Sequence, residues 1–317
     1  MTLLVSTLVL TLAWFSALNI VSSLLVWLIA GGLRRGQSFV RPSAQWLFAL
    51  RVAPLLISSV FAIGVFLPVH LMYEGREGSE YFGALLWSGA LLAVGLIGES
   101  ALRVVLALRG YARLRRTWGR PVGERPPIVS DCEILGISLA GILHPTIVVG
   151  RRVREALTRE ELDVALDHEI AHWQSWDNVK RFAMFASPDV LRFTRVAADL
   201  EHGWCAEAEC LADARAVDGD ASRAVNLASA LVKVARLATA RTEAFVAGPL
   251  WSAFHEDGLL ELRIRRLVDG PIVAPRSSWL LLIGSAAATL GTIALAYLAD
   301  VPRAVHFLTE GLVQLLP

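Results

Sequence analysis

Apolar residues gather in four long blocks along this chain. Three of the blocks contain no charged residue, and the block that begins at residue 81 contains only Glu99 and Arg103, near its end. A helix that crosses a bilayer needs about 20 predominantly apolar residues. A cleavable signal peptide or one buried helix could explain one such block but not four. The pattern therefore predicts membrane-spanning helices over about 3–33, 52–72, 81–105 and 279–299.

The range 110–275, between the third and fourth blocks, has the residue pattern of a soluble domain. β-Branched residues are frequent between Ile128 and Val149, which predicts short strands. From Thr158 the apolar residues recur at helical spacing, and Thr158 and Glu161 have the spacing of a capping box. We expect a mostly helical domain with a small β-sheet in front, and helices over about 158–177, 188–216, 221–242 and 259–267.

Composition agrees with this division. The 317 residues are 55% hydrophobic and only 19% charged, whereas about a quarter of the residues of a soluble domain are charged. The net charge of +1 provides no basic field, so we expect no direct nucleic-acid binding. The three cysteines form no CxxC pair, and we interpret them as reduced apolar residues. The predicted organisation is a membrane region over 1–109, a domain over 110–275, and a fourth helix with a short tail over 276–317.

The charges in the loops predict an orientation. The loop between the first two blocks carries four arginines and no acidic residue, whereas the next loop carries three glutamates and one arginine. Arginine-rich loops remain on the cytoplasmic side. We therefore expect a multi-pass protein of a bacterial-type plasma membrane, with its N-terminus outside and the range 110–275 in the cytosol.

The helix predicted from Thr158 contains the sequence His168-Glu-Ile-Ala-His172. Histidines four residues apart lie on one helical face, so both imidazoles can reach one metal ion. Glu169 is then placed to accept a proton from water, as the general base of a zinc peptidase. The alternative is a helix with two surface histidines and a solvated glutamate. The spacing favours zinc.

A catalytic zinc site requires a third protein ligand and one open position. Glu209 and Asp213 are candidates, since they are four residues apart and share a helical face. Glu209 could be the ligand and Asp213 the carboxylate that holds a ligand histidine. Glu207 and Glu201 compete with Glu209 for the ligand role.

Together these segments resemble the BlaR/MecR-type integral membrane zinc metallopeptidases, which are related to the prenyl-protease-like and heat-shock membrane zinc proteases. The resemblance is carried by the four-span layout and by His168-Glu-Ile-Ala-His172 with Asp177-Asn178, Glu209 with Asp213, and Arg263-Ile-Arg-Arg-Leu267. It implies a zincin-type domain that binds Zn²⁺, with Glu209 as third ligand. It also implies that the protein substrate is a cytosolic transcriptional repressor. The antibiotic-sensing members carry a large sensor domain after the last span, and residues 300–317 are too short to form one, so we expect no direct β-lactam sensing.

Three further assignments are hypotheses about the surroundings of the zinc. Asp177 could form an ion pair with Arg263 and fix the end of the zinc helix. His202 lies seven residues before Glu209 and could hydrogen-bond the oxyanion of the transition state. The predicted strand could pair with the backbone of a peptide substrate through Thr146, Ile147, Val148 and Val149.

The leading hypothesis is a membrane-bound zinc endopeptidase that cleaves a regulatory protein at the cytosolic face. One alternative is a protease for quality control or processing of membrane proteins, which would use the same residues on other substrates. The other is a signalling scaffold without turnover, for which Glu169 would have no use. The sequence assigns no role to His70 or Glu99.

Overall fold

The computed structural model describes residues 3–35, 42–73, 82–118, 126, 128–132, 136–239, 251–253, 259–269 and six residues between 304 and 311. These residues form a mostly helical protein with one small mixed sheet. Three helical segments are long and apolar enough to cross a membrane, over Leu4–Gly32, Ala44–Met72 and Ala84–Arg115. The fourth predicted helix, over 279–299, lies outside the described residues.

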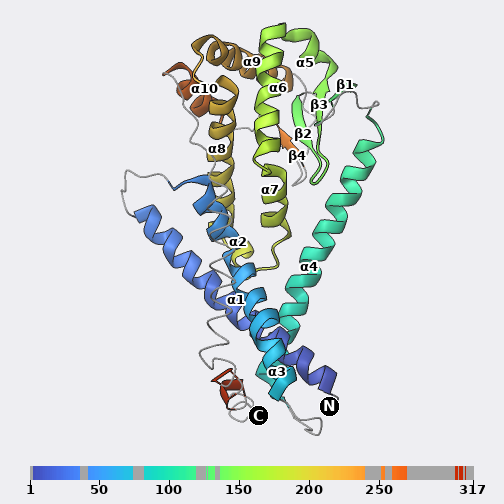
Figure 1. Cartoon of the computed structure of the whole chain (residues 1–317), viewed down its shortest axis with the longest axis vertical. Helices are drawn as coiled ribbons and strands as arrows, with labels where there is room; N and C mark the ends of the chain where they lie inside the picture. Colours follow the sequence, from blue (N-terminus) through green and yellow to red (C-terminus); the bar gives the residue numbers. More distant parts are fainter. Residues whose placement is uncertain are drawn as a thin grey trace.

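The apolar segments are α1 (Leu3–Arg35), a continuous helix formed by α2 (Ala44–Phe61), η1 (Ala62–Phe66) and α3 (Leu67–Tyr73), and α4 (Ala84–Arg115). The α1 and α4 helices diverge towards the side where the remaining elements lie (Figure 1). The second helical segment begins eight residues before the predicted start at residue 52. The prediction stopped at the charge of Arg51, which is buried inside the protein.

The sheet contains β1 (Ile128–Cys132), β2 (Ile137–Ala140), β3 (Thr146–Gly150) and β4 (Trp251–Ala253), in the order β1-β3-β2-β4. Strand β3 pairs in parallel with β1 and antiparallel with β2, and all five of its residues are buried. The hypothesis that Thr146, Ile147, Val148 and Val149 bind substrate is therefore wrong, because both edges of their strand already form hydrogen bonds to neighbouring strands. The sequence pattern identified the strand but could not reveal its central place in the sheet.

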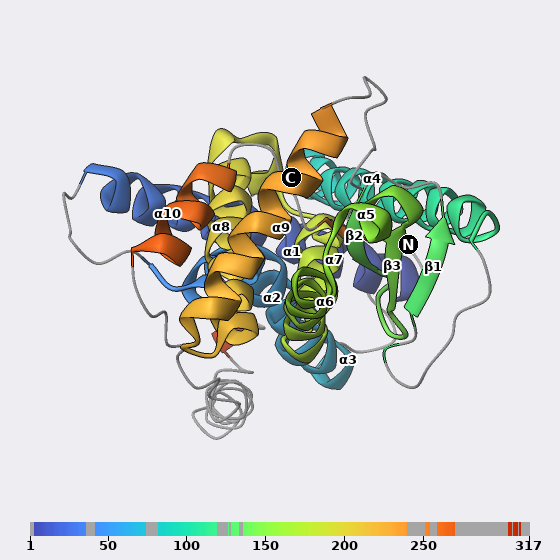
Figure 2. The same cartoon turned by 90° about the horizontal axis from the view of Figure 1, so that it is seen from above.

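Seven helical segments accompany the sheet: α5 (Arg151–Ala156), α6 (Arg159–Gln174), α7 (Asp177–Ala186), η2 (Val190–Phe193), α8 (Arg195–Val217), α9 (Ala221–Thr239) and α10 (Leu260–Val268). Seen from above, α6 lies next to β2 and β3, and α8 lies on the side of α6 away from the strands, with α9 crossing obliquely beside both helices (Figure 2). The core joins apolar side chains of these elements, including Ile147, Val164 and Leu231.

The capping box predicted at the start of α6 is confirmed: Thr158 and Glu161 exchange both hydrogen bonds. The end of this helix differs from the prediction. The helix stops at Gln174, and Trp176 adopts a left-handed conformation with φ of 57°. This bend lets α7 begin at Asp177 in a new direction, so that Asp177 lies beside the last turn of α6.

Candidate metal centre

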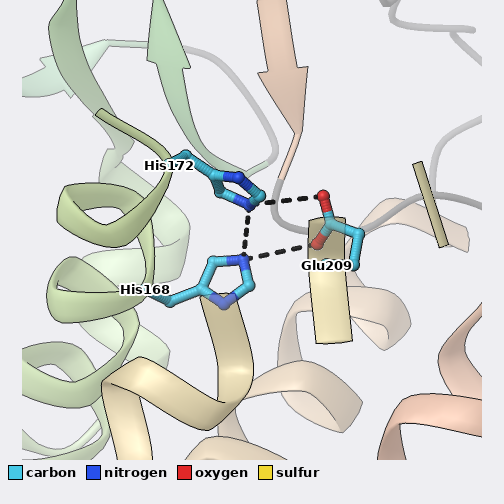
Figure 3. Close-up of side chains that lie close together, drawn as sticks. All are labelled: His168, His172 and Glu209. Atoms are coloured by element: carbon cyan, nitrogen blue, oxygen red, sulfur yellow. Dashed lines mark hydrogen bonds and ion pairs between the residues drawn. The ribbon is translucent and has the colours of Figure 1, made fainter. Parts of the chain in front are cut away.

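Two helices bring three potential metal ligands together. His168 and His172 lie one turn apart on α6, and Glu209 faces them from α8 (Figure 3). The two Nε2 atoms are 3.1 Å apart, and each lies 3.3 Å from one carboxylate oxygen of Glu209. All three side chains are buried. Such a group could hold a metal ion.

Each histidine is oriented by a carboxylate on its other ring nitrogen. Nδ1 of His168 lies 2.9 Å from Oδ1 of Asp213, which is one turn after Glu209 on α8. Nδ1 of His172 lies 2.9 Å from Oδ2 of Asp177, the first residue of α7. Carboxylates that hold Nδ1–H fix the orientation of the ring, so that Nε2 is the nitrogen that faces a metal. Both Nε2 atoms thus face Glu209.

Glu169 is fully buried beside the histidines. Neither of its carboxylate oxygens has a hydrogen-bond partner among the described residues. Burial raises the pKa of this carboxyl group above its ordinary value, although His168 and His172 oppose the shift. A buried carboxyl group without protein partners is costly. The Glu169 carboxyl group is therefore suited to binding a polar group of a ligand or a water molecule.

Arg263 completes the site from α10, and it differs from the expectation for this residue. Its guanidinium binds both oxygens of Asp213, with Nε at 2.8 Å and Nη2 at 2.6 Å, and its Nη1 lies 3.0 Å from Glu209. Asp177 instead pairs with His172 and with Lys180, whose Nζ is 3.1 Å away. The predicted Asp177–Arg263 pair is therefore wrong, because Arg263 on α10 binds the carboxylates of α8 instead.

The charges of these buried groups depend on one another. Burial opposes protonation of His172, but the carboxylates of Glu209 and Asp177 outweigh it and raise the pKa to about 10. Burial also opposes ionisation of Glu209, yet His172 and Arg263 hold its pKa well below the ordinary range. The buried carboxylates therefore favour a positive charge on His172, and a bound metal ion would supply that charge instead of a proton. Metal binding at such a site releases protons.

The acidic residues that competed for the ligand role are engaged elsewhere. Glu207 is half-buried and pairs with Arg266 at 3.6 Å, and Glu201 pairs with Arg51 at 2.6 Å. His202 is exposed, and its Nδ1 lies 2.8 Å from the carbonyl oxygen of Ala198, so it is not a member of the buried group. Its role at an oxyanion stays a prediction. The sequence analysis named Arg263 but missed its partners, Asp213 and Glu209, because contacts between α10 and α8 leave no local signal in the sequence.

Comparison of the chain with protein-family models gives no match, and neither does a search of the curated proteins. The site is thus defined by its own geometry. It is a buried group of two histidines and one glutamate, with a carboxylate on each histidine and a second, unpartnered glutamate beside them.

Proposed function

We propose that this protein is a membrane-bound zinc peptidase. The observation that carries the proposal is the convergence of His168 and His172 from one helix with Glu209 from another, next to the unpartnered carboxyl group of Glu169. The alternative of a scaffold without turnover gives no reason to bury Glu169 without a partner. Glycine, alanine or an apolar residue would be less costly there.

The distances within the group support zinc as the metal. Nitrogen and oxygen ligands bind zinc at about 2.0–2.1 Å in a tetrahedron, so neighbouring ligand atoms lie about 3.3–3.4 Å apart. The two Nε2 atoms here are 3.1 Å apart, and those of His168 and His172 lie 3.3 Å from Oε2 and Oε1 of Glu209, respectively, which is close to that spacing. The ligand set of two histidines and one carboxylate is typical of catalytic zinc, which keeps its fourth position open.

In this proposal, each residue has a distinct task. A zinc ion bound by the three ligands would polarise the scissile carbonyl group and lower the pKa of a water molecule to about 7. Glu169 accepts the proton of that water and delivers it to the leaving amine. Burial raises the pKa of this carboxyl group, which is the direction expected of a group that both accepts and releases a proton. Asp213 and Asp177 keep the two imidazole rings in place.

We place the metal site on the cytosolic side of a plasma membrane. The arginine-rich loops support this orientation. The substrate would be a cytosolic protein, and the resemblance to the antirepressor peptidases favours a transcriptional repressor.

The first experiment measures zinc in purified protein. We expect about one zinc ion per chain, and loss of most of it in His168→Ala, His172→Ala and Glu209→Gln. The matched control is Glu207→Gln, two residues from Glu209 on the same helix, which should keep its zinc. Full zinc in the Glu209 variant together with loss in the Glu207 variant would show that the ligand set is wrong.

The second experiment separates metal binding from turnover. Cleaved N-termini are compared by mass spectrometry between cells that contain the native protein and cells that contain Glu169→Gln. This substitution keeps the size of the side chain but removes the base, so we expect unchanged zinc content and a loss of cleavage of about 100-fold or more. Retained cleavage would contradict the role of Glu169, and identical N-termini in cells with and without the native protein would favour the scaffold.

A further inference from the structure

All three apolar helices form hydrogen bonds with one short segment where α7 leads into α8. This segment, residues 184–192, runs from the last turn of α7 into η2, and we call it the joint. It forms side-chain contacts with Asn19 of α1, with Arg51 of α2, and with Glu99, Ser100 and Arg103 of α4. A segment that contacts all three of the described apolar helices is tied to the packing of those helices.

Arg51 contacts both the joint and α8. Its guanidinium donates from Nη2 to the carbonyl oxygen of Met184 at 3.0 Å, from Nη1 to Asp189 at 2.8 Å, and from Nε to Glu201 at 2.6 Å. Arg51 is 1% exposed. One side chain of α2 therefore holds the end of α7, the joint and the beginning of α8 in a fixed relation.

The α1 and α4 helices bind the backbone of the same segment. Asn19 uses both ends of its amide: Oδ1 accepts from Val190 N at 3.0 Å and Nδ2 donates to Pro188 O at 3.3 Å. From α4, Ser100 donates to the carbonyl oxygen of Ala186 and Arg103 to that of Phe185. These contacts satisfy backbone groups that would otherwise be unpaired among apolar helices.

The joint also connects the two halves of the metal centre. On one side, α7 begins with Asp177, which orients His172. On the other side, α8 carries Glu209 and Asp213. Glu201, the partner of Arg51, precedes Glu209 by eight residues, or about 12 Å along a helix. Because a helix of this length moves as a unit, a shift of α8 at Glu201 would move Glu209 relative to the histidines.

We propose that Arg51 is a positioning residue that sets the placement of α8 against α7, so that the metal affinity of the His168–His172–Glu209 group depends on the packing of the membrane helices. The proposal rests on the metal-binding part of the proposed function and is independent of the substrate. A guanidinium is suited to this task, because its donors form a rigid fork that can fix three acceptors at once. A change in the packing of α1, α2 and α4 would thereby alter the metal centre.

The test uses Co²⁺ as the probe, in full-length protein reconstituted in lipid nanodiscs. Tetrahedral Co²⁺ has visible absorption bands that report both occupancy and ligand geometry. In Arg51→Gln we expect the dissociation constant for Co²⁺ to rise about tenfold, a typical size for coupling between distant sites, and the band to change shape. Arg51→Lys keeps the charge without the fork and should show a smaller change.

The matched control is Arg265→Gln, which removes an arginine whose side chain is 73% exposed and whose ion pair among the described residues is with Glu261. It should leave the Co²⁺ affinity unchanged. A merely structural role for Arg51 would lower the unfolding temperature but leave the affinity and the band of the folded protein as they are, and this result would overturn the proposal.

If Arg51→Gln does not fold, Asn19→Ala provides the second variant, because it removes two neutral hydrogen bonds to the joint and no charge. It should weaken Co²⁺ binding in the same direction, and unchanged binding would overturn the proposal. Absence of any Co²⁺ band in the native protein would contradict the metal centre itself. That outcome is distinct from a native band that the variants leave unchanged.

Discussion

Two buried arginines bind α8 at different positions along the helix, and their carboxylate partners differ in burial. Arg263 reaches it from α10 and binds Glu209 and Asp213, both of which are buried. Arg51 reaches it from α2 and binds Glu201, whose side chain is 41% exposed, together with the buried Asp189. Arg263 therefore neutralises the carboxylates of the candidate metal centre directly, whereas Arg51 contacts α8 about two turns before Glu209. Both arginines bind two carboxylates, but Arg263 balances the charge of the candidate metal centre, whereas we propose that Arg51 positions α8.

The largest expected effect is that of Arg263→Met. The substitution leaves the carboxylates of Glu209 and Asp213 in a buried site without their cation, and loss of one partner of a buried ion pair costs about 3–5 kcal/mol. Unfolding monitored by circular dichroism in detergent should show this loss in metal-free protein. Added zinc should recover part of the stability, since the cation replaces charge that the arginine supplied. A loss below 1 kcal/mol would contradict the account of the site.

Arg51→Met should have a smaller effect on stability, about 2 kcal/mol. Asp189 loses its partner in a buried position, but the half-exposed Glu201 regains water. The same unfolding experiment measures it. A loss as large as that of Arg263→Met would remove the distinction between the two networks.

Asp177→Asn tests the contact between the first residue of α7 and His172. The amide keeps the shape but weakens the hold on Nδ1, and such substitutions typically reduce metal affinity 10-fold to 100-fold. We expect a reduction of about tenfold, measured by competition with a zinc chelator. Asp213→Asn should cause a larger reduction, because Asp213 also binds Arg263. If Asp177→Asn reduced the metal affinity more than Asp213→Asn, the carboxylate of α7 would matter more for metal binding than that of α8.

The smallest effect is expected for Arg265→Gln. This arginine lies two residues from Arg263 on α10, but it is exposed and pairs with an equally exposed Glu261. Exposed pairs contribute about 0–1 kcal/mol. An unfolding free energy within about 0.5 kcal/mol of the native value would show that burial, not the number of arginines on α10, gives Arg263 its importance.

Local signals in the sequence were sufficient for much of this structure. The apolar blocks predicted three helices that the structure describes, and the spacing of Thr158 and Glu161 predicted the start of α6. The spacing of His168 and His172 placed both rings on one face, since that follows from helix geometry alone. Glu209 was placed opposite them only with the help of a family resemblance, because the approach of α8 to α6 is a tertiary contact.

The errors arose where tertiary packing decides. Nothing in Thr146–Val149 distinguishes a central strand from an edge strand, because strand order depends on partners far along the chain. The bend at Trp176 interrupts a helical pattern that continues through it, so the helix was expected to reach Asp177. Arg51 was counted as a loop charge that orients the protein in the membrane, whereas its burial depends on acceptors that lie more than 130 residues later.

The binding of the joint has a consequence for the order of assembly during synthesis. The ribosome makes α1, α2 and α4 before it makes residues 184–192. At 5–20 residues per second, roughly 4–15 s separate the end of α4 from the end of the joint. The apolar helices can therefore associate first, so that Asn19, Arg51 and Ser100 are in place before the joint is synthesised. The α6, α7 and α8 helices can then pack against residues that are already in place, before Glu209 meets the two histidines.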